Sequence, residues 1–103
     1  MLKKIVNEKL YNPSTAKRIF GWDNQCYGDF RFEEEILFRK RTNPAQFFLY
    51  CSGGPMTQYA RSEGNTTYGS ETIKPLSLEQ AKIWLEKKAD ADTYIQIFGP
   101  VEE

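Results

Sequence analysis

Histidine is absent from this chain of 103 residues. Without it, Ser-His-Asp and Cys-His catalysis, most catalytic zinc sites and the commonest general base at neutral pH are excluded. Cys26 and Cys51 are too far apart in the sequence for a zinc knuckle and too few for a disulfide framework, so we expect a reduced, cytosolic setting. No stretch approaches the roughly 18 apolar residues of a membrane span, and no apolar export signal follows Met1. We therefore expect no membrane partner.

A strong charge of either sign is also missing. The formal net charge is zero, although residues 1–75 have a small excess of Lys and Arg, and residues 76–103 an equal excess of Asp and Glu. This asymmetry is too mild for a dedicated nucleic-acid binder but allows a local basic patch and an acidic end. Apolar residues make up 40% and aromatic residues 15%, which predicts a folded chain, and the length predicts a single domain, 1–103.

Alternating apolar and polar residues indicate an antiparallel sheet built of hairpins. In segment 30–41 one side is mostly apolar and the other mostly charged, which is typical of a half-buried strand. Turn formers at 42–45 join it to a second apolar run. Segment 52–70 is rich in Gly, Ser, Thr and Asn and is predicted to be a long loop with room for one helical turn at 56–60. The predicted strands are 3–6, 9–11, 30–41, 46–51 and 71–74.

Capping signals predict three helices. Asn12 before Pro13 indicates a short helix at 13–20. Ser77 and Gln80 form a capping box that opens a helix at 78–88, and a last helix, with Tyr94 and Phe98 on its apolar face, follows Asp90 or Asp92. We assign Trp84, Tyr94 and Phe98 to the core. The predicted fold class is α+β, a small antiparallel sheet of hairpins with a short N-terminal helix and two C-terminal helices packed on one face.

Three features near the centre of the sequence have both a chemical and a purely structural interpretation. Cys51 is the best nucleophile available, with Arg61 as a cation that would favour its thiolate, or it is a small buried apolar residue at a strand end. Residues 52–55, Ser-Gly-Gly-Pro, form either a phosphate cradle or a strand-ending turn. Residues 33–35, three glutamates, offer carboxylates for a metal or a proton transfer, or are a protective charge run on an exposed strand. The second interpretation is favoured in each case.

Two surfaces are predicted to bind a partner. A basic patch at the hairpin end, with Arg31 on the same side of the strand, would contact phosphates or an acidic protein, or would only solubilise the hairpin. Aromatic and basic residues in the glycine-rich segment suit a contact surface, although the tyrosines could equally anchor the loop. The predicted partner-binding residues are Arg31, Arg39, Lys40, Arg41, Tyr59, Arg61 and Tyr68.

Three stretches together resemble a protein family. They are KKIVNEKLYNPSTAKRI, ILFRKRTNPAQFFLYCSGGPMTQYA and IKPLSLEQAKIWLEKKADADTYIQIFGPVEE, which cover nearly the whole chain. Their order and content resemble small proteins of phages, plasmids and integrative elements in Gram-positive bacteria. The chain departs from that set at 7–8, where Asn-Glu replaces Asn-Gly, at 43–45, where Asn-Pro-Ala enlarges the central turn, and at Cys51, where glycine is common. Members of this set resemble inhibitors of the RNA-guided nuclease of type II CRISPR systems, or are found next to such inhibitors.

The resemblance implies a non-enzymatic anti-CRISPR inhibitor in the cytoplasm of a bacterial host cell. Its partner would be the CRISPR effector nuclease or its guide RNA, and it would act by binding them or by lowering the effector's level. No cofactor and no small-molecule substrate are expected, and no site residue comes with the resemblance. An acidic end that mimics nucleic acid and a basic hairpin that holds RNA remain alternative modes. A binding module with another partner and a cysteine-dependent enzyme are the other hypotheses.

Overall fold

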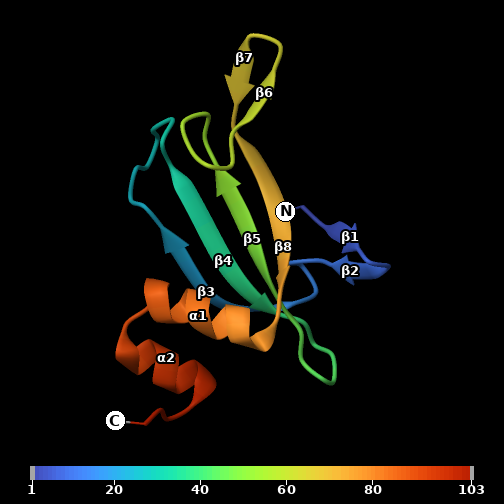
Figure 1. Ribbon diagram of the computed structural model, residues 1–103, viewed down its shortest axis with the longest axis vertical. Coiled ribbons are helices and arrows are strands. Elements are labelled where there is room, and N and C mark those ends of the chain that lie inside the picture. Colours follow the sequence, from blue (N-terminus) through green and yellow to red (C-terminus); the bar gives the residue numbers. More distant parts are fainter. Residues whose placement is uncertain (1, 103) are drawn as a thin grey trace.

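The computed structural model describes residues 2–102 and has an α+β fold, as predicted. Four antiparallel strands form a central sheet in the order β3-β4-β5-β8, and helices α1 and α2 lie side by side across its lower half (Figure 1). Two further hairpins, β1-β2 and β6-β7, extend from this sheet. The elements are β1 (Lys4–Val6), β2 (Lys9–Tyr11), β3 (Lys17–Asp23), β4 (Glu33–Arg39), β5 (Phe47–Gly53), β6 (Arg61–Glu63), β7 (Thr66–Tyr68), β8 (Ser70–Leu76), α1 (Leu78–Lys88) and α2 (Ala91–Phe98).

The sheet has an apolar core on each of its two faces. Leu37, Phe47 and Leu49 lie on the face that the helices cover, where Ala81 packs onto them. The opposite face carries a second cluster, on which the first hairpin packs through Tyr11 and Val6; its sheet residues are Ile36, Phe38, Phe48, Tyr50 and Ile73. Because adjacent residues of a strand point to opposite faces, this two-sided covering makes the middle of β4 and β5 almost continuously buried.

The predicted helix at 13–20 is wrong, because this segment is a turn followed by strand β3. The Asn12 side chain does accept a backbone N–H, but that of Ser14 at 3.0 Å, which forms a tight turn in place of a helix cap. From Lys17 the chain pairs with β4 along its whole length. The β-branched and aromatic residues that follow suit a strand, and the hydrogen bonds to β4 outweigh a weak local helix signal.

The prediction of a half-buried strand at 30–41 also needs correction. Strand β4 spans Glu33–Arg39 and is buried on both faces from Glu35 to Phe38. Leu37, placed on the charged side by simple alternation, is fully buried because the helices cover that side. Glu35, expected in an exposed charge run, is only 7% exposed. The matching hairpin between β4 and β5 is confirmed by their paired register, from Glu33 opposite Gly53 to Arg39 opposite Phe47.

Segment 52–70 contains more regular structure than predicted. The residues at 56–60 form turns and no helix, and the exposed hairpin β6-β7 follows them. Its two-residue connection contains Gly64 with a φ of 62°, which suits glycine. Strand β8 continues through Pro75, opposite Phe48, because it is an edge strand of the sheet and proline is tolerated there.

The two C-terminal helices and the first hairpin are confirmed. Ser77 and Gln80 form the predicted capping box, and the Asp90 side chain caps α2. Asn7 and Glu8 both adopt positive φ in the turn between β1 and β2. Trp84 and Phe98 pack against the buried cluster below the helices, and Tyr94 is half-buried against Phe98. No helix among residues 2–102 is long and apolar enough to cross a membrane.

Candidate functional site

The four predicted basic residues of β4 and its flanks do not form one patch. Arg31 precedes β4 and forms an exposed ion pair with Asp29 at 2.9 Å. Arg39 is the last residue of β4, and the six steps from Glu33 cover roughly 20 Å. Lys40 lies over the Tyr11 ring at 4.4 Å and donates to Gln46 Oε1, while Arg41 is exposed in the hairpin loop. Arg31 is therefore separated from Arg39, Lys40 and Arg41 by the length of the strand.

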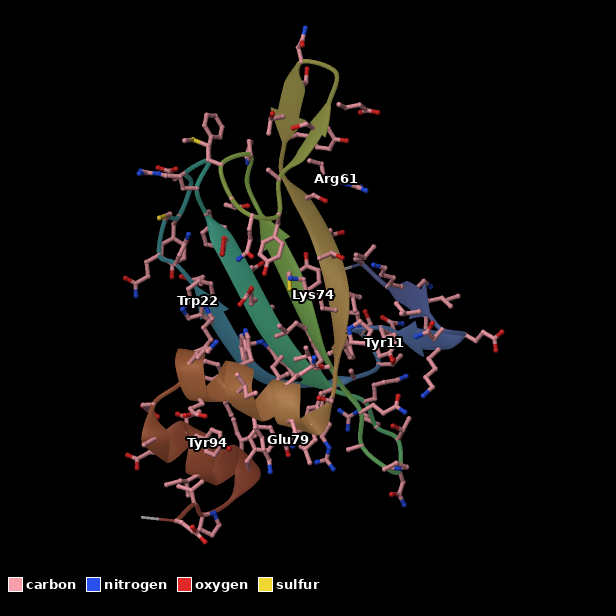
Figure 2. The ribbon with its side chains drawn as sticks, in the orientation of Figure 1. Tyr11, Trp22, Arg61, Lys74, Glu79 and Tyr94 are labelled. Atoms are coloured by element: carbon pink, nitrogen blue, oxygen red, sulfur yellow. The ribbon has the colours of Figure 1, made fainter. Side chains whose placement is uncertain are left out.

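The three predicted residues of the glycine-rich segment have different environments. Tyr59 is buried, with 8% of its surface exposed, and its hydroxyl donates to the Glu35 carboxylate. Burial, followed by this hydrogen bond, raises the pKa of Tyr59 above its usual range. Arg61 and Tyr68 lie opposite each other on the exposed hairpin β6-β7, and Figure 2 shows Arg61 at the base of that hairpin. Tyr59 is a core residue, whereas the other two remain accessible.

The structure favours the simpler interpretation of the Cys-Ser-Gly-Gly corner. Cys51 is completely buried, and burial raises the pKa of its thiol, so the thiolate is scarce at neutral pH. The Gly54 amide donates to the Phe32 carbonyl at 2.9 Å and the Met56 amide to the Phe30 carbonyl at 2.9 Å. A phosphate cradle needs these amides free. The corner therefore joins the end of β5 to the loop that precedes β4.

A charged cluster, here called the Glu35 centre, fixes α1 to the sheet. Glu35 Oε1 accepts a hydrogen bond from Trp84 Nε1 at 2.8 Å, and Lys88 Nζ lies 3.8 Å from the same oxygen. Lys88 also lies 3.4 Å from the centroid of the Trp22 ring. Figure 2 shows Trp22 on β3 directly above the helix pair. The second carboxylate oxygen, Oε2, accepts a hydrogen bond from the Tyr59 hydroxyl. Both oxygens of the buried carboxylate therefore have partners within the protein, and Glu35 has a structural role.

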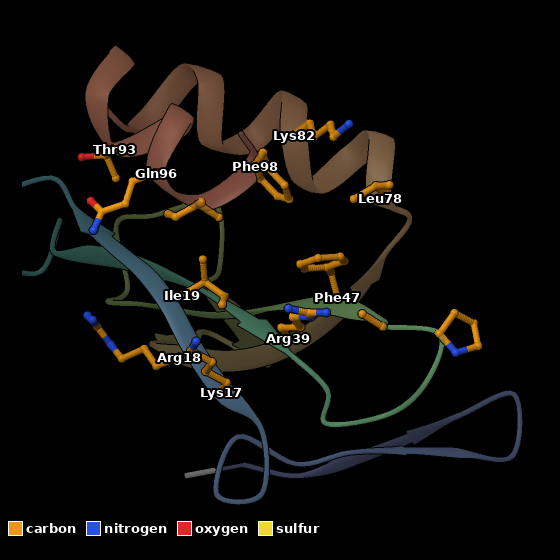
Figure 3. A pocket seen from close by; sticks show the side chains of 13 residues that line it. Lys17, Arg18, Ile19, Arg39, Phe47, Leu78, Lys82, Thr93, Gln96 and Phe98 are labelled. Carbon is orange, nitrogen blue, oxygen red and sulfur yellow. The ribbon is translucent and has the colours of Figure 1, made fainter. Parts of the chain in front are cut away.

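A groove of about 790 Å³ lies between the lower end of the sheet and the helices (Figure 3). We call it the basic groove, because four of its residues are cationic: Lys17, Arg18, Arg39 and Lys82. The sheet contributes Lys17 and Arg39 from adjacent strands, and α1 contributes Lys82 from the opposite wall. None of the residues that line the groove is acidic.

Lys17 and Arg39 are directly opposite each other across β3 and β4. Opposed cations on adjacent strands repel each other, so this pair lowers stability unless an anion lies between them. Within residues 2–102, ion pairs are formed by Arg31 with Asp29 and by Lys88 with Glu35, and by no other lysine or arginine. The cations of the basic groove thus have no carboxylate partner in the described part of the chain. The groove is suited to an anionic ligand.

Apolar and polar neutral residues complete the walls. Ile19, Phe47 and Phe98 line the interior of the groove, and Leu78, 48% exposed, stands at its mouth. Lys82 Nζ lies 5.9 Å from the centroid of the Phe98 ring. Helix α2 adds three residues of one face, Thr93, Gln96 and Ile97. The groove therefore combines positive charge with apolar surface and hydrogen-bonding side chains.

Arg18 is the exception among the four cations. It is opposite Phe38, on the face of the sheet that the helices leave open. Its guanidinium lies across Gly21, where a β-carbon would collide with it. We therefore assign the anion-binding role to Lys17, Arg39 and Lys82 alone.

Sequence reasoning found Arg39 but missed Lys17 and Lys82. Lys17 fell within the segment predicted to be helical, so its strand partner could not be identified. Lys82 belongs to a correctly predicted helix, and the only signal available was that it lies one helical turn after the exposed Leu78. Residues 2–102 contain no group of three Cys, Asp or Glu side chains that could hold a metal ion.

Comparison with known proteins identifies no relative. No family model matches the chain, and no curated protein and no solved structure is significantly similar to it.

Proposed function

We propose that this chain is a non-enzymatic inhibitor of an RNA-guided type II nuclease, acting by binding the effector or its guide RNA, or by lowering the effector's level. The resemblance of its three long sequence stretches to mobile-element proteins supports the class of target. The basic groove supports the guide-RNA mode in particular, because three cations without carboxylate partners in the described residues line one hollow. This uncompensated charge along the groove is the observation that carries the proposal from the structure.

A cleavage assay with a guide-loaded type II nuclease and its target DNA tests the proposal. The added protein is expected to reduce cleavage in proportion to its concentration. The double variant Arg39→Glu/Lys82→Glu reverses the charge of the groove and is expected to abolish inhibition through the RNA mode. Lys87→Glu is the matched control, because Lys87 is exposed on the same helix and does not line the groove. Circular dichroism of each variant verifies that it is folded.

Each outcome separates the parts of this proposal. Full cleavage at a large excess of the wild-type protein, with nuclease levels in cells unchanged, would contradict inhibition altogether. Inhibition that survives charge reversal would exclude the groove and direct attention to contact with the effector through another surface. Inhibition lost in the groove variant and kept in Lys87→Glu is the expected result.

An exposed apolar cluster favours a second candidate, a protein-binding module of a mobile element. Phe30 and Met56 are 69% and 66% exposed at the upper end of the sheet, where the Met56 amide donates to the Phe30 carbonyl, and Tyr27, 69% exposed, belongs to the same loop as Phe30. Apolar residues clustered on a surface commonly mark protein contacts. Affinity purification from a host that carries the nuclease would return another protein if this candidate is right. Phe30→Ser would then abolish the capture, while the groove variant would not.

A further inference from the structure

We infer that the basic groove holds an unpaired, single-stranded segment of nucleic acid, with its phosphates at Lys17, Arg39 and Lys82 and a base against the apolar wall at Phe98 and Leu78. This inference rests on the guide-RNA mode of the proposed function and specifies which form of the RNA is bound.

The arrangement of charge gives the first step. Lys17 and Arg39 are neighbours across two strands, and Lys82 lies on α1, on the other wall of the groove beyond Phe98. A nucleic-acid strand that runs from the sheet to α1 would place one phosphate at Lys17 and Arg39 and another at Lys82. It would also relieve the repulsion between Lys17 and Arg39, so binding is coupled to the stability of this end of the sheet.

The apolar wall gives the second step. Phosphates alone need no apolar surface, yet the half-buried Phe98 and the exposed Leu78 line the same hollow as the cations. Single strands expose base faces that stack on aromatic and apolar side chains, while their backbones follow a basic groove. A duplex keeps its base faces stacked inside and presents mainly phosphate and sugar. The apolar wall therefore favours an unpaired strand over a duplex.

The dimensions of the groove give the third step. Its volume of about 790 Å³ lies within the range of sites that hold one ligand of nucleotide size or slightly larger. It is bounded on opposite sides by the sheet and the helix pair (Figure 3). A duplex needs an open basic surface, whereas one extended strand can enter between two walls. Thr93 and Gln96 offer hydrogen bonds to base or sugar edges within the same space.

Fluorescence anisotropy with two probes tests the inference. One probe is a labelled hexauridylate, and the other is a blunt RNA duplex of about 12 base pairs. The single strand is expected to bind at least about ten-fold more tightly. Its affinity should fall with salt with a logarithmic slope of about −2, because each phosphate contact of a single strand contributes roughly −0.7.

Variants separate charge from stacking. Lys82→Gln should reduce the slope by about 0.7, whereas Lys87→Gln should leave the slope and affinity unchanged. Leu78→Ala should weaken single-strand binding several-fold at an unchanged slope, and Leu78 is exposed enough for the protein to stay folded. Phe98→Leu, which keeps an apolar side chain at this position, should do the same.

Three results would overturn the inference: equal or tighter binding of the duplex, an unchanged slope in Lys82→Gln, or no binding of either probe at low salt. Failure of the proposed function is distinguishable. If the protein prefers the single strand but never inhibits the guide-loaded nuclease, the groove assignment stands and the anti-CRISPR proposal fails. If it inhibits the nuclease but binds both probes equally, the reverse holds.

Discussion

The Glu35 centre and the basic groove lie on the same face of one sheet, four residues apart along β4, but their charges have opposite environments. Glu35 is buried and accepts hydrogen bonds from Tyr59 and Trp84, with Lys88 beside it. Arg39 is exposed, faces Lys17 across the strands and has no carboxylate partner within residues 2–102. The same helix, α1, contributes Lys88 to the first site and Lys82 to the second.

This difference separates charge that stabilises the fold from charge that is available to a ligand. A buried carboxylate must be satisfied by the protein itself, because an unpaired charge there costs several kcal/mol. Opposed cations at the surface lower stability slightly, and such locally unfavourable pairs are typical of binding sites. Substitutions at the two sites should therefore change different properties of the protein.

Glu35→Ala should have the largest effect on stability. It removes the acceptor of the Tyr59 hydroxyl and of Trp84 Nε1, and leaves Lys88 half-buried without its anion. We expect the free energy of unfolding to fall by about 3 kcal/mol, measured by urea denaturation. Glu34→Ala is the neighbouring control, and its loss should be well below 1 kcal/mol because Glu34 accepts only one long bond, from Ser52. Equal losses in the two variants would contradict a structural role specific to Glu35.

A pH titration tests a second polar group that is hydrogen-bonded within the protein, the Tyr50 hydroxyl on the opposite face of the sheet. Burial, with the hydrogen bond to Glu71, raises the pKa of Tyr50 to about 12. A group with a higher pKa in the folded state holds its proton more tightly there, so its contribution is complete below the unfolded pKa of about 10. Stability should therefore fall as pH rises from about 10 towards about 12. Urea denaturation across this range should show a smaller fall in Tyr50→Phe, and an identical fall would refute the assignment.

The parts of this fold that could be predicted from the sequence are those with local causes. The capping box at Ser77 and the turn between β4 and β5 depend on residues close in sequence, and both are present. The Asn12-Pro13 signal was misleading because the same side-chain bond can close a turn, and pairing with β4 decided the outcome. Burial of Glu35 could not be predicted because it depends on where α1 packs.

The basic groove was beyond sequence reasoning for a related reason. Its three cations come from β3, β4 and α1, and only strand pairing and helix packing bring them together. Arg39 was identified because it belongs to the basic run 39–41. The other two residues of that run lie outside the groove, because Lys40 packs over the Tyr11 ring and Arg41 is exposed in the hairpin loop. By contrast, hairpin β6-β7 could have been predicted, because the Gly64-Asn65 pair, followed by the β-branched and aromatic residues 66–68, is a known two-residue hairpin signal.

Lys17→Glu should give the basic groove an internal ion pair, as the Glu35 centre already has. It converts the opposed cations into an opposite-charge pair with Arg39, so the free energy of unfolding should rise by about 0.5 kcal/mol at low salt. Phosphate should stabilise the wild-type protein and lose this effect in the variant. Thermal unfolding with and without phosphate measures both. Lys9→Glu, on the exposed strand β2 opposite Val6, should show neither change, and a stabilisation of equal size there would contradict the repulsion.

Arg31→Gln should have the smallest effect, because it tests a paired charge that is not buried. Its hydrogen bonds to Asp29 lower the pKa of that carboxyl to about 2. The lowered pKa means that the pair contributes above the ordinary pKa of Asp and loses its contribution as pH falls towards about 2. NMR titration should show the pKa of Asp29 returning towards about 4 in Arg31→Gln. Because solvent screens this exposed pair, its contribution at pH 7 should be too small to change the urea midpoint measurably. A clear loss of stability would mean that pairing by itself, without burial, stabilises this fold, and the contrast between the Glu35 centre and the basic groove would then reflect pairing alone.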